Sequence, residues 1–390
     1  MSTVTATTRS DRDSGPRAAL TRFSRAGHHS LTEPSSGPTA GGELTTSIRD
    51  VAGRAGVSVG TVSNVLNRPD TVSAGTRQRV LDAIAALGFV RNESARHLRA
   101  GRSRTIGLVV LDIANPFFTD VARGVEEVAN AEGLAVILCN SDDRPVKEAA
   151  HLDVLAEHAV QGVLITPTPE LSPALGVLRD RGVPVVLVDR RAPAPDQCSV
   201  AVDDVLGGRL AAAHLLERGH RRIAFIGGDP GLPQVQERLE GVASAVRESV
   251  GDDSHPDGAL LVLSPPTLTV AGGREAGEQI IGLPADRRPT AAICANDLLA
   301  LGLLQEMVRH GVRVPDDMAI VGYDDIDFAA AAAVPLTSVR KPRYELGRRA
   351  AEMLLDEARN PDHRHEQLVF EPQLVVRESS MVRRANGVPS

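Results

Sequence analysis

A serine set between two glycines is the residue pattern in this chain that most resembles a reacting group. Gly56-Val57-Ser58-Val59-Gly60 matches GxSxG, the pattern in which many hydrolases hold a nucleophilic serine. That chemistry needs the serine on a sharp turn between a strand and a helix. Here the pattern lies between two segments of helical spacing, with no strand before it. We therefore predict a helix-capping serine and, since no other nucleophile and base stand out, a protein that is not an enzyme.

Histidine and cysteine side chains could instead bind a metal ion, but their spacing along the chain predicts no such site. His151 and His158 are seven apart on a predicted helix, and His363 and His365 lie in a polar loop. Neither pair has Cys or carboxylates at ligand spacing, so both are interpreted as ordinary surface residues. The three cysteines are Cys139, Cys198 and Cys294. They are widely separated and form no CxxC pair, which favours reduced thiols. No metal or cofactor is expected.

Polar side chains that follow apolar strands could bind a small molecule. Asp189, Asn296 and Asp324 each come after such a segment. Their carboxylate and amide groups would face the carboxyl edge of a sheet and could hydrogen-bond a polar ligand there. Phe117 and Phe118 are adjacent aromatics that could stack on a sugar or purine ring, or simply fill the core.

The elements around Ser58 have the pattern of a helix-turn-helix. Apolar residues at i, i+3, i+4 and i+7 put Ile48, Val51, Ala52 and Ala55 on one face, and the pattern resumes after Gly56. Glycine can adopt the positive φ that ends a helix, and Ser58 can cap the next one. A third helix is predicted over Thr76–Leu87. The second helix would present small polar residues, which allow close approach to DNA.

Downstream of Thr105, apolar strand segments alternate with segments of helical length. Eight strands are expected, at Thr105–Leu111, Leu134–Cys139, Gly162–Thr166, Pro184–Val188, Arg222–Ile226, Ala259–Leu263, Ala291–Ala295 and Met318–Tyr323. Two series of about four strands predict an α/β body of two doubly wound lobes with parallel sheets. Ligands of such sheets bind at the carboxyl ends of strands, so the cleft between the lobes is the expected pocket.

Charge is unevenly distributed along the chain. The net charge is −7, but residues 45–104 carry ten basic and four acidic residues, a balance of +6. Residues 1–44 contribute +1, so the remainder carries −14. Only the helical front therefore matches the charge of nucleic-acid phosphates. Residues 1–44, rich in Ser, Thr, Gly and Pro, are predicted to be a disordered tail. With no signal peptide and no apolar run of membrane-spanning length, a cytoplasmic protein without membrane contact is expected.

The chain resembles the LacI/GalR (lactose-repressor) family of bacterial transcription regulators from about Ser47 to Glu378. The most specific matches are the helix-turn-helix, the basic stretch FVRNESARHLRAGRSRTIGLVV, and the short segments NPFF, CAND and VGYDD. The resemblance implies an N-terminal all-α DNA-binding domain followed by a two-lobe, type I periplasmic-binding-protein-like body. The expected boundaries are 45–90 for the DNA-binding domain, 91–103 for a hinge helix and linker, 104–199 plus 336–361 for lobe 1, and 200–335 plus 366–380 for lobe 2.

Expected DNA contacts fall into three groups. Geometry predicts base readout by the start of the second helix, with Val59, Gly60 and Asn64 as candidates. Polar residues suited to phosphates, or equally to caps and turns, are Ser47, Ser58, Thr61, Ser63, Asn67 and Thr76. The segment Asn92–Arg99 resembles the family's hinge helix, which implies that Leu98 enters a central base step beside Ala95, with Asn92 nearby. At Asn64 the family commonly has arginine, so an altered base preference is expected.

The resemblance implies two further effector-binding residues, Arg190 and Gln236. The full set is Phe117, Phe118, Asp189, Arg190, Gln236, Asn296 and Asp324. Gln236 stands where the family usually has an arginine, which makes a strongly anionic effector less favoured unless Arg190 or Arg238 compensates.

The sequence thus predicts a repressor that binds a pseudo-palindromic operator in double-stranded DNA as a homodimer, under control of a sugar-like or nucleoside-like effector. Residues 383–390 show no leucine heptads, which favours a dimer over a tetramer. Two alternatives are a solute-binding or sugar-binding protein with the same body and a regulator controlled by a protein partner. A transport receptor would carry a secretory signal and lack the basic helical front, the reverse of what this chain has.

Overall fold

The structure is a computed structural model that describes residues 46–89, 103–228, 230–250 and 259–381. Contacts between residues divide the chain into two units, Met1–Asn92 and Glu93–Ser390, and each is described by itself. The predicted tail and hinge helix lie outside the described residues. Among the described helices, none has the length and apolar character needed to cross a membrane.

The first unit contains three α-helices and a short 3-10 turn. They are α1 (Ile48–Ala55), α2 (Val59–Asn67), η1 (Pro69–Thr71) and α3 (Ala74–Leu87). The apolar faces predicted from helical spacing meet in one small core, with Val51, Val62 and Val80 fully buried at its centre. The helix-turn-helix and the third helix are therefore confirmed, and α3 begins two residues earlier than expected.

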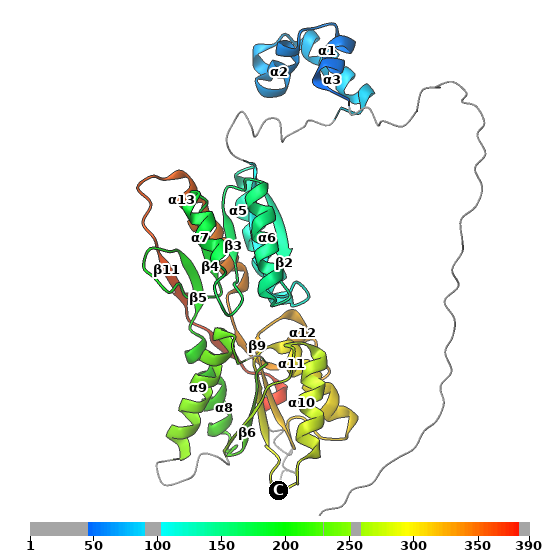
Figure 1. Cartoon of the computed structure of the whole chain (residues 1–390). Helices are drawn as coiled ribbons and strands as arrows, with labels where there is room; N and C mark the ends of the chain where they lie inside the picture. The colour runs from blue at the N-terminus through cyan, green and yellow to red at the C-terminus, as the bar shows by residue number, and fades with distance from the viewer. Residues whose placement is uncertain (1–45, 90–102, 229, 251–258, 382–390) are drawn as a thin grey trace, which may run out of the picture. The chain divides into compact units, whose positions relative to one another are not determined.

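The second unit contains two six-stranded sheets, each flanked by helices (Figure 1). The sheet of lobe 1 has the order β11-β5-β4-β3-β1-β2 and is parallel throughout. Its strands are β1 (Thr105–Val110), β2 (Ala135–Asn140), β3 (Val163–Ile165), β4 (Val185–Val188), β5 (Ser199–Val202) and β11 (Gln367–Phe370). Its helices are α5 (Pro116–Ala131), α6 (Pro145–Glu157), α7 (Pro173–Asp180) and α13 (Arg343–Arg359).

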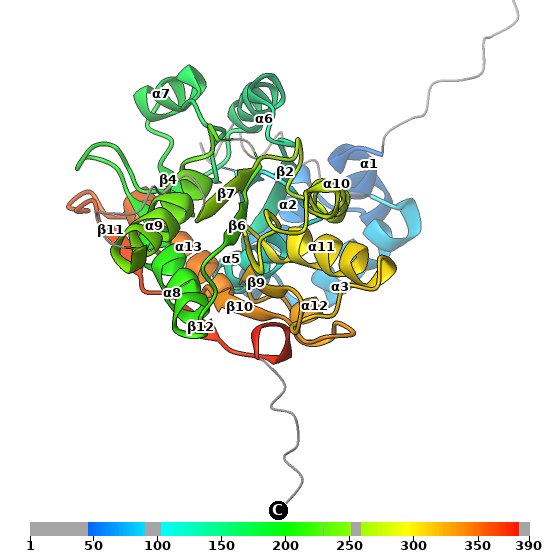
Figure 2. The same cartoon turned by 90° about the horizontal axis from the view of Figure 1, so that it is seen from below.

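The sheet of lobe 2 has the order β12-β10-β9-β8-β6-β7, with β12 antiparallel to β10. Its strands are β6 (Ile223–Ile226), β7 (Leu260–Leu263), β8 (Ala291–Cys294), β9 (Ala319–Asp324), β10 (Thr337–Arg340) and β12 (Gln373–Val375). Its helices are α8 (Asp204–Glu217), α9 (Pro233–Val250), α10 (Val270–Gly282), α11 (Asp297–Arg309), the short α12 (Asp327–Ala330) and the 3-10 turn η3 (Glu378–Ser380). Figure 2 shows α8 and α9 on one side of this sheet and α10 and α11 on the other.

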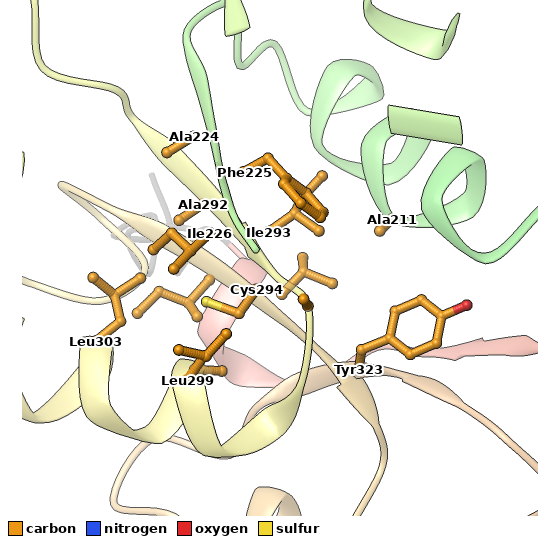
Figure 3. Packing of buried hydrophobic residues seen from close by; sticks show 14 of the residues in the cluster. Ala211, Ala224, Phe225, Ile226, Ala292, Ile293, Cys294, Leu299, Leu303 and Tyr323 are labelled. Atoms are coloured by element: carbon orange, nitrogen blue, oxygen red, sulfur yellow. The ribbon is translucent and has the colours of Figure 1, made fainter. Parts of the chain in front are cut away.

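The core of lobe 2 lies between this sheet and its helices. Phe225, Ile293 and Leu299 are each at most 1% exposed, and Figure 3 shows them gathered around Cys294. The strand segments predicted from apolar runs supply the cores of both lobes, and all eight are found in the structure to within two residues at each end.

The expected lobe boundaries need correction. The chain crosses between the lobes three times, between β5 and α8, between β10 and α13, and between β11 and β12. β5 and β11 belong to lobe 1, whereas the boundaries placed most of β5 and all of β11 in lobe 2. β10, expected in the return segment of lobe 1, belongs to lobe 2. The terminal segment 366–380, expected wholly in lobe 2, contains one strand of each sheet, because the chain passes from one sheet to the other between Phe370 and Gln373.

Candidate functional site

Ser58 begins the second helix of the helix-turn-helix. Gly56 ends α1 with a φ of 65°, a left-handed conformation that favours glycine. The Oγ of Ser58 accepts a hydrogen bond from the backbone N–H of Thr61 at 3.1 Å, as an N-cap does. The GxSxG pattern therefore forms a helix cap between two helices, as predicted, and its serine has no strand-to-helix turn around it.

The residues predicted to read bases lie on the exposed face of α2. Val59, Gly60 and Asn64 are exposed, and Val59 keeps 42% of its surface accessible. Val62 and Val65 on the opposite face are buried and fix the helix against α1 and α3. The branched apolar side chain of Val59, the backbone of Gly60 and the amide of Asn64 are thus presented together. This combination suits close approach to base edges in a major groove.

The residues predicted to contact phosphates form local hydrogen bonds that fit the alternative interpretation as caps. Ser47 caps α1 in a reciprocal capping box with Asp50. Asn67 donates a hydrogen bond to Ser63 at 3.2 Å, and Ser73 donates one to Thr76 at 3.1 Å. Capping hydroxyls at helix starts still have lone pairs and protons that could meet phosphate oxygens, so those contacts stay a prediction. Asn92, Ala95 and Leu98 lie outside the described residues.

A cavity of about 520 Å³ lies between the two lobes, where the carboxyl ends of the strands meet. Its volume is within the usual range for small-molecule sites. The lining residues are Leu111, Asp112, Asn115, Phe117, Phe118, Asp142, Asp143, Asp189, Leu232, Gln234, Val235, Arg238, Pro266, Thr267, Leu268, Thr269, Asn296 and Asp324.

Phe117 and Phe118 form the aromatic part of the lining. They stand in the first turn of α5, which begins at Pro116 under the cap of Asn115. Their rings meet edge to face with centroids 5.0 Å apart, and both also belong to the core of lobe 1. The two interpretations offered by the sequence are therefore compatible, because one side of this ring pair packs inside the lobe while the pair also lines the cavity.

Two buried ion pairs lie at the cleft. Lys341 donates to the carboxylate of Asp189, and Nε of Arg238 donates to Oδ1 of Asp204 at 2.9 Å. Burial raises the pKa of Asp189 to about 6, against the attraction of Lys341. Burial also opposes ionisation of Asp204, but the charges of Arg238 and Lys341 and the hydrogen bonds from Arg238 and Tyr323 together outweigh it, so the pKa of Asp204 is lowered. The guanidinium of Arg238 also lies 3.9 Å from the centroid of the Tyr323 ring.

Asn296 and Asp324 lie in the cleft as predicted, but the amide of Asn296 is already in use. Its Oδ1 accepts from Leu299 N at 2.8 Å and caps α11, while its Nδ2 donates to the Leu268 carbonyl at 2.8 Å. Asn296 therefore orders the wall of the cavity as well as lining it. Asp324 ends β9 with a φ of 95°, a conformation that turns the chain at the rim of the cleft.

Two predicted effector residues are not in the cavity wall. Arg190 donates to the Thr168 and Pro169 carbonyls and lines a separate small pocket. Gln236 is exposed and donates to the Pro230 carbonyl.

Gln234 and Arg238 occupy the cavity wall where Gln236 was expected. They stand four residues apart on α9 and so share a face, whereas Gln236, two residues from each, points elsewhere. Helical periodicity from Pro233 could have found this pair. Gln234 also donates to the Asp189 carbonyl at 2.8 Å, and its buried Oε1 accepts no hydrogen bond from the described residues.

Comparison with known proteins agrees with both units. The model of "Bacterial regulatory proteins, lacI family" matches residues 47–92, and that of the "Periplasmic binding protein-like domain" matches residues 212–380. The HTH-type transcriptional repressor PurR of Photobacterium profundum is 35% identical over 338 residues, covering 85% of this chain and 98% of the relative.

Two solved structures extend the similarity to the fold. The transcriptional regulator CelR in complex with cellobiose is 32% identical with a TM-score of 0.62, covering 86% of this chain and 99% of that one. The lac repressor dimer bound to operator and the anti-inducer ONPF is 25% identical with a TM-score of 0.72, at the same coverage.

A helical DNA-reading unit joined to a two-lobe body with a ligand-sized cleft defines a DNA-binding transcription regulator under effector control, not an enzyme. The chain belongs to the lacI family of bacterial regulatory proteins.

Proposed function

We propose that the protein is a repressor that binds a pseudo-palindromic operator as a dimer and changes its affinity for DNA when a neutral, polyhydroxylated small molecule enters the inter-lobe cleft. The observation that carries this proposal is the combination of the exposed α2 face with the cleft between the lobes. Relatives named as transcriptional repressors, and a lac repressor dimer bound to operator, support the DNA-binding part.

The charge of the cleft supports a neutral effector. One cation, Arg238, is among the described residues that line the cavity, against five carboxylates: Asp112, Asp142, Asp143, Asp189 and Asp324. Arg238 is paired with the buried Asp204, and Lys341 is paired with the buried Asp189. An anionic ligand would meet net repulsion there, whereas hydroxyl groups could donate to these oxygens. The phenylalanine pair offers an apolar ring surface beside them, an arrangement that suits a sugar or the ribose of a nucleoside. One relative was solved with cellobiose, which fits this class.

Two exposed strand edges support dimer formation. β2 and β7 each end their sheet, and each leaves an apolar side chain open, Leu138 at 39% and Val262 at 45% exposure. Edge strands with apolar side chains are normally covered. A second copy of the chain packed along these edges would cover them and would bring a second recognition helix for the other half of a palindrome.

The proposal is tested by selecting DNA from a random pool with the purified full chain. Selection and affinity measurements are repeated with a panel of neutral sugars and nucleosides and with sugar phosphates as the anionic control. We expect enrichment of an inverted repeat, binding that weakens steeply with salt, and a change in affinity with a neutral member of the panel. Absence of sequence-specific binding under every condition contradicts the repressor, and a response restricted to the anionic members contradicts the neutral effector.

A further inference from the structure

Four potential metal ligands meet in lobe 1, away from the cleft. Cys198 lies just before β5, Glu357 lies near the end of α13, and His363 and His365 lie in the loop that leads to β11. The interpretation of His363 as an ordinary surface residue needs correction, because its side chain is 9% exposed and contacts Cys198, whereas His365 is exposed as expected. The sequence could not show the cluster because Cys198 is 165 residues from His363 and reaches it only through the pairing of β5 with β11.

The distances between the four donor atoms fit one tetrahedral ion. Sγ of Cys198 lies 3.2 Å from Nε2 of His363 and 3.6 Å from Nδ1 of His365. Oε2 of Glu357 lies 3.9 Å from each of those nitrogens, and all four atoms are within 4.8 Å of one another. With bonds of about 2.0–2.3 Å, neighbouring ligands of a tetrahedral zinc ion are about 3.3–3.6 Å apart. The two sulfur–nitrogen distances already meet that geometry, and the longer separations, up to 4.8 Å, would have to shorten by about 1 Å through side-chain rotation.

The surroundings of His363 prepare its Nε2 for a metal. Nδ1 of His363 lies 2.6 Å from Oδ2 of Asp356, so the carboxylate can hold the proton on Nδ1 and leave a lone pair on Nε2. A carboxylate behind a ligating imidazole is the usual second partner of histidine in metal sites, because it fixes the ring and strengthens the ligand. The ring of His363 is thus oriented with Nδ1 toward Asp356 and with Nε2 toward the other three ligands.

Burial makes the cluster costly without an ion. Cys198 is fully buried, and the side chain of His363 is 9% exposed. Oε2 of Glu357 is buried and accepts no hydrogen bond of normal geometry from the described residues. A divalent cation would neutralise the carboxylate and a thiolate together. The side chain of His365 is 34% exposed, which gives an ion a path from solvent.

We propose that Cys198, Glu357, His363 and His365 bind one divalent transition-metal ion, with zinc as the preferred ion for a tetrahedral set of one sulfur, two nitrogens and one oxygen. On binding, the Cys198 thiol gives its proton to solvent and a sulfur–metal bond forms. The ion joins the start of β5, the end of α13 and the approach to β11. β5 and β11 run from this edge of the sheet to two of the three lobe crossings, so the ion fixes both crossing strands at their beginnings.

The test uses the full chain, reduced, stripped of metal with a chelator and titrated with Co²⁺ in the absence of DNA. We expect uptake of one equivalent with a thiolate-to-cobalt charge-transfer absorption that Zn²⁺ removes by displacement. Cys198→Ser should abolish the absorption, and the matched variant Cys139→Ser, whose buried thiol is in another part of lobe 1, should retain it. His158→Gln, at an exposed histidine outside the cluster, serves as the imidazole control.

A second variant separates metal binding from folding. Asp356→Asn removes the carboxylate behind His363 from a side chain that is 55% exposed, so the fold should persist while zinc affinity falls about 10–100-fold. Zinc should also raise the thermal unfolding midpoint of the unaltered chain more than that of Asp356→Asn. Failure of the folded, reduced chain to take up Co²⁺, persistence of the absorption in Cys198→Ser, or equal zinc affinity in Asp356→Asn overturns the proposal. None of these outcomes depends on whether the protein is a repressor.

Discussion

At the scale of single residues, the recognition helix offers little side chain for reading bases. Gly60 contributes only backbone, and the nearest atom to a Cβ built there is Oγ of Ser58 at 3.6 Å, so the position is open enough for larger residues. Asn64 is exposed on the same face. An asparagine amide pairs well with the hydrogen-bonding edge of adenine, whereas arginine pairs with guanine. Base preference at this position should therefore follow the identity of residue 64.

Asn64→Arg should change the selected operator from adenine to guanine at one position in each half-site, because the guanidinium forms two hydrogen bonds with O6 and N7 of guanine. Discrimination at that position should change by about 1–3 kcal/mol. Selection of DNA by both proteins under identical salt measures the shift. Ser63→Ala, at a half-buried neighbour, is the control and should leave the preferred bases unchanged. An identical consensus from the arginine variant contradicts the base-reading role of residue 64.

Of two glutamines on α9, Gln234 lines the cavity and Gln236 lies on the surface. Gln234→Leu removes an amide that lines the cleft, and we expect effector affinity to fall at least about tenfold, with operator affinity in the absence of effector retained. Gln236→Leu, on the exposed side, should leave effector affinity within about twofold. Titration calorimetry with the responding member of the effector panel measures both. The reverse ranking would place the ligand on the other face of α9.

Stability against acid should depend on His214. Burial, then Arg218, lowers its pKa from 6.5 to about 4, and its ring can donate from Nε2 to Ser380 while Nδ1 accepts from Arg218. Between pH 4 and 6.5 the unfolded chain binds more protons at this site than the folded chain, so its contribution is present above about pH 6.5 and is lost toward pH 4. Asp189, with a raised pKa, acts in the opposite direction in much of this range.

The His214 contribution is therefore measured as a difference between proteins. His214→Gln keeps a donor and an acceptor but does not titrate, so the loss of unfolding free energy from about pH 7 to about pH 5 should be smaller in the variant by about 1–2 kcal/mol. Urea unfolding at the two pH values gives the comparison, and the exposed His158→Gln should behave like the unaltered chain. Equal pH dependence in all three proteins contradicts a buried neutral His214.

At the scale of elements, three helix pairs cross through reciprocal glycines. In lobe 1, a Cβ on Gly124 of α5 would lie 2.1 Å from the Tyr344 carbonyl oxygen, and one on Gly347 of α13 would lie 2.0 Å from the Val121 carbonyl oxygen. The same arrangement joins α8 with α9 and α10 with α11 through two further pairs, Gly208 with Gly241 and Gly273 with Gly302. Glycine is needed at each crossing because the partner's backbone occupies the space of a side chain.

Gly347→Ala should lower the free energy of unfolding by about 2–4 kcal/mol, because the methyl group would force α5 and α13 apart. Gly176→Ala on α7 is the matched control, since nothing lies within 4 Å of a Cβ there and the helix should gain about 0.5–1 kcal/mol. Denaturant unfolding of the two variants and the unaltered chain measures the effect. Similar stability of both variants would mean that the crossing relaxes at little cost.

Apolar patterning found the strands with clear apolar runs and missed β5, which is short, and β10, which is largely polar. β10 has the sequence TSVR, yet Thr337 and Ser338 are fully buried because their hydroxyls donate to the Arg377 carbonyl and to Asp297. No hydropathy pattern marks such a strand. β5, at Ser199–Val202, is short and lay across the expected lobe boundary. Residues at strand ends, such as Asp189 and Asp324, were predictable because parallel topology brings strand ends together, whereas Gln234 needed the start of α9 to be known.

At the scale of the whole molecule, charge and connectivity assign DNA binding and effector binding to different parts of the chain. The balance of +6 over residues 45–104 against −14 downstream confines attraction for phosphates to the helical front. The body can respond to a ligand because its lobes are joined by only three crossings and by contacts in the cleft. A ligand that prefers one arrangement of the lobes shifts DNA affinity by the same factor by which DNA shifts ligand affinity. The contacts that join the lobes are therefore the place to test coupling.

The ion pair between Lys341 and Asp189 is such a contact, because Lys341 follows β10 at a crossing and Asp189 follows β4 in lobe 1. Lys341→Met should cost about 3–5 kcal/mol of unfolding free energy near neutral pH by leaving a buried carboxylate unpaired. Adding Asp189→Asn should restore most of it, since asparagine is neutral and tolerates the φ of 56° at this position. Denaturant unfolding of the unaltered chain, the two single variants and the double variant gives the four free energies of a double-mutant cycle.

The same variants test whether this contact couples the lobes. Restored stability without restored effector response would mean that the charge pair itself links the two lobe arrangements, whereas full recovery of both would assign it to folding alone. If the effects of Lys341→Met and Asp189→Asn on the free energy of unfolding simply add in the double variant, the pairing is contradicted, because removing one of two interacting buried charges changes the effect of removing the other.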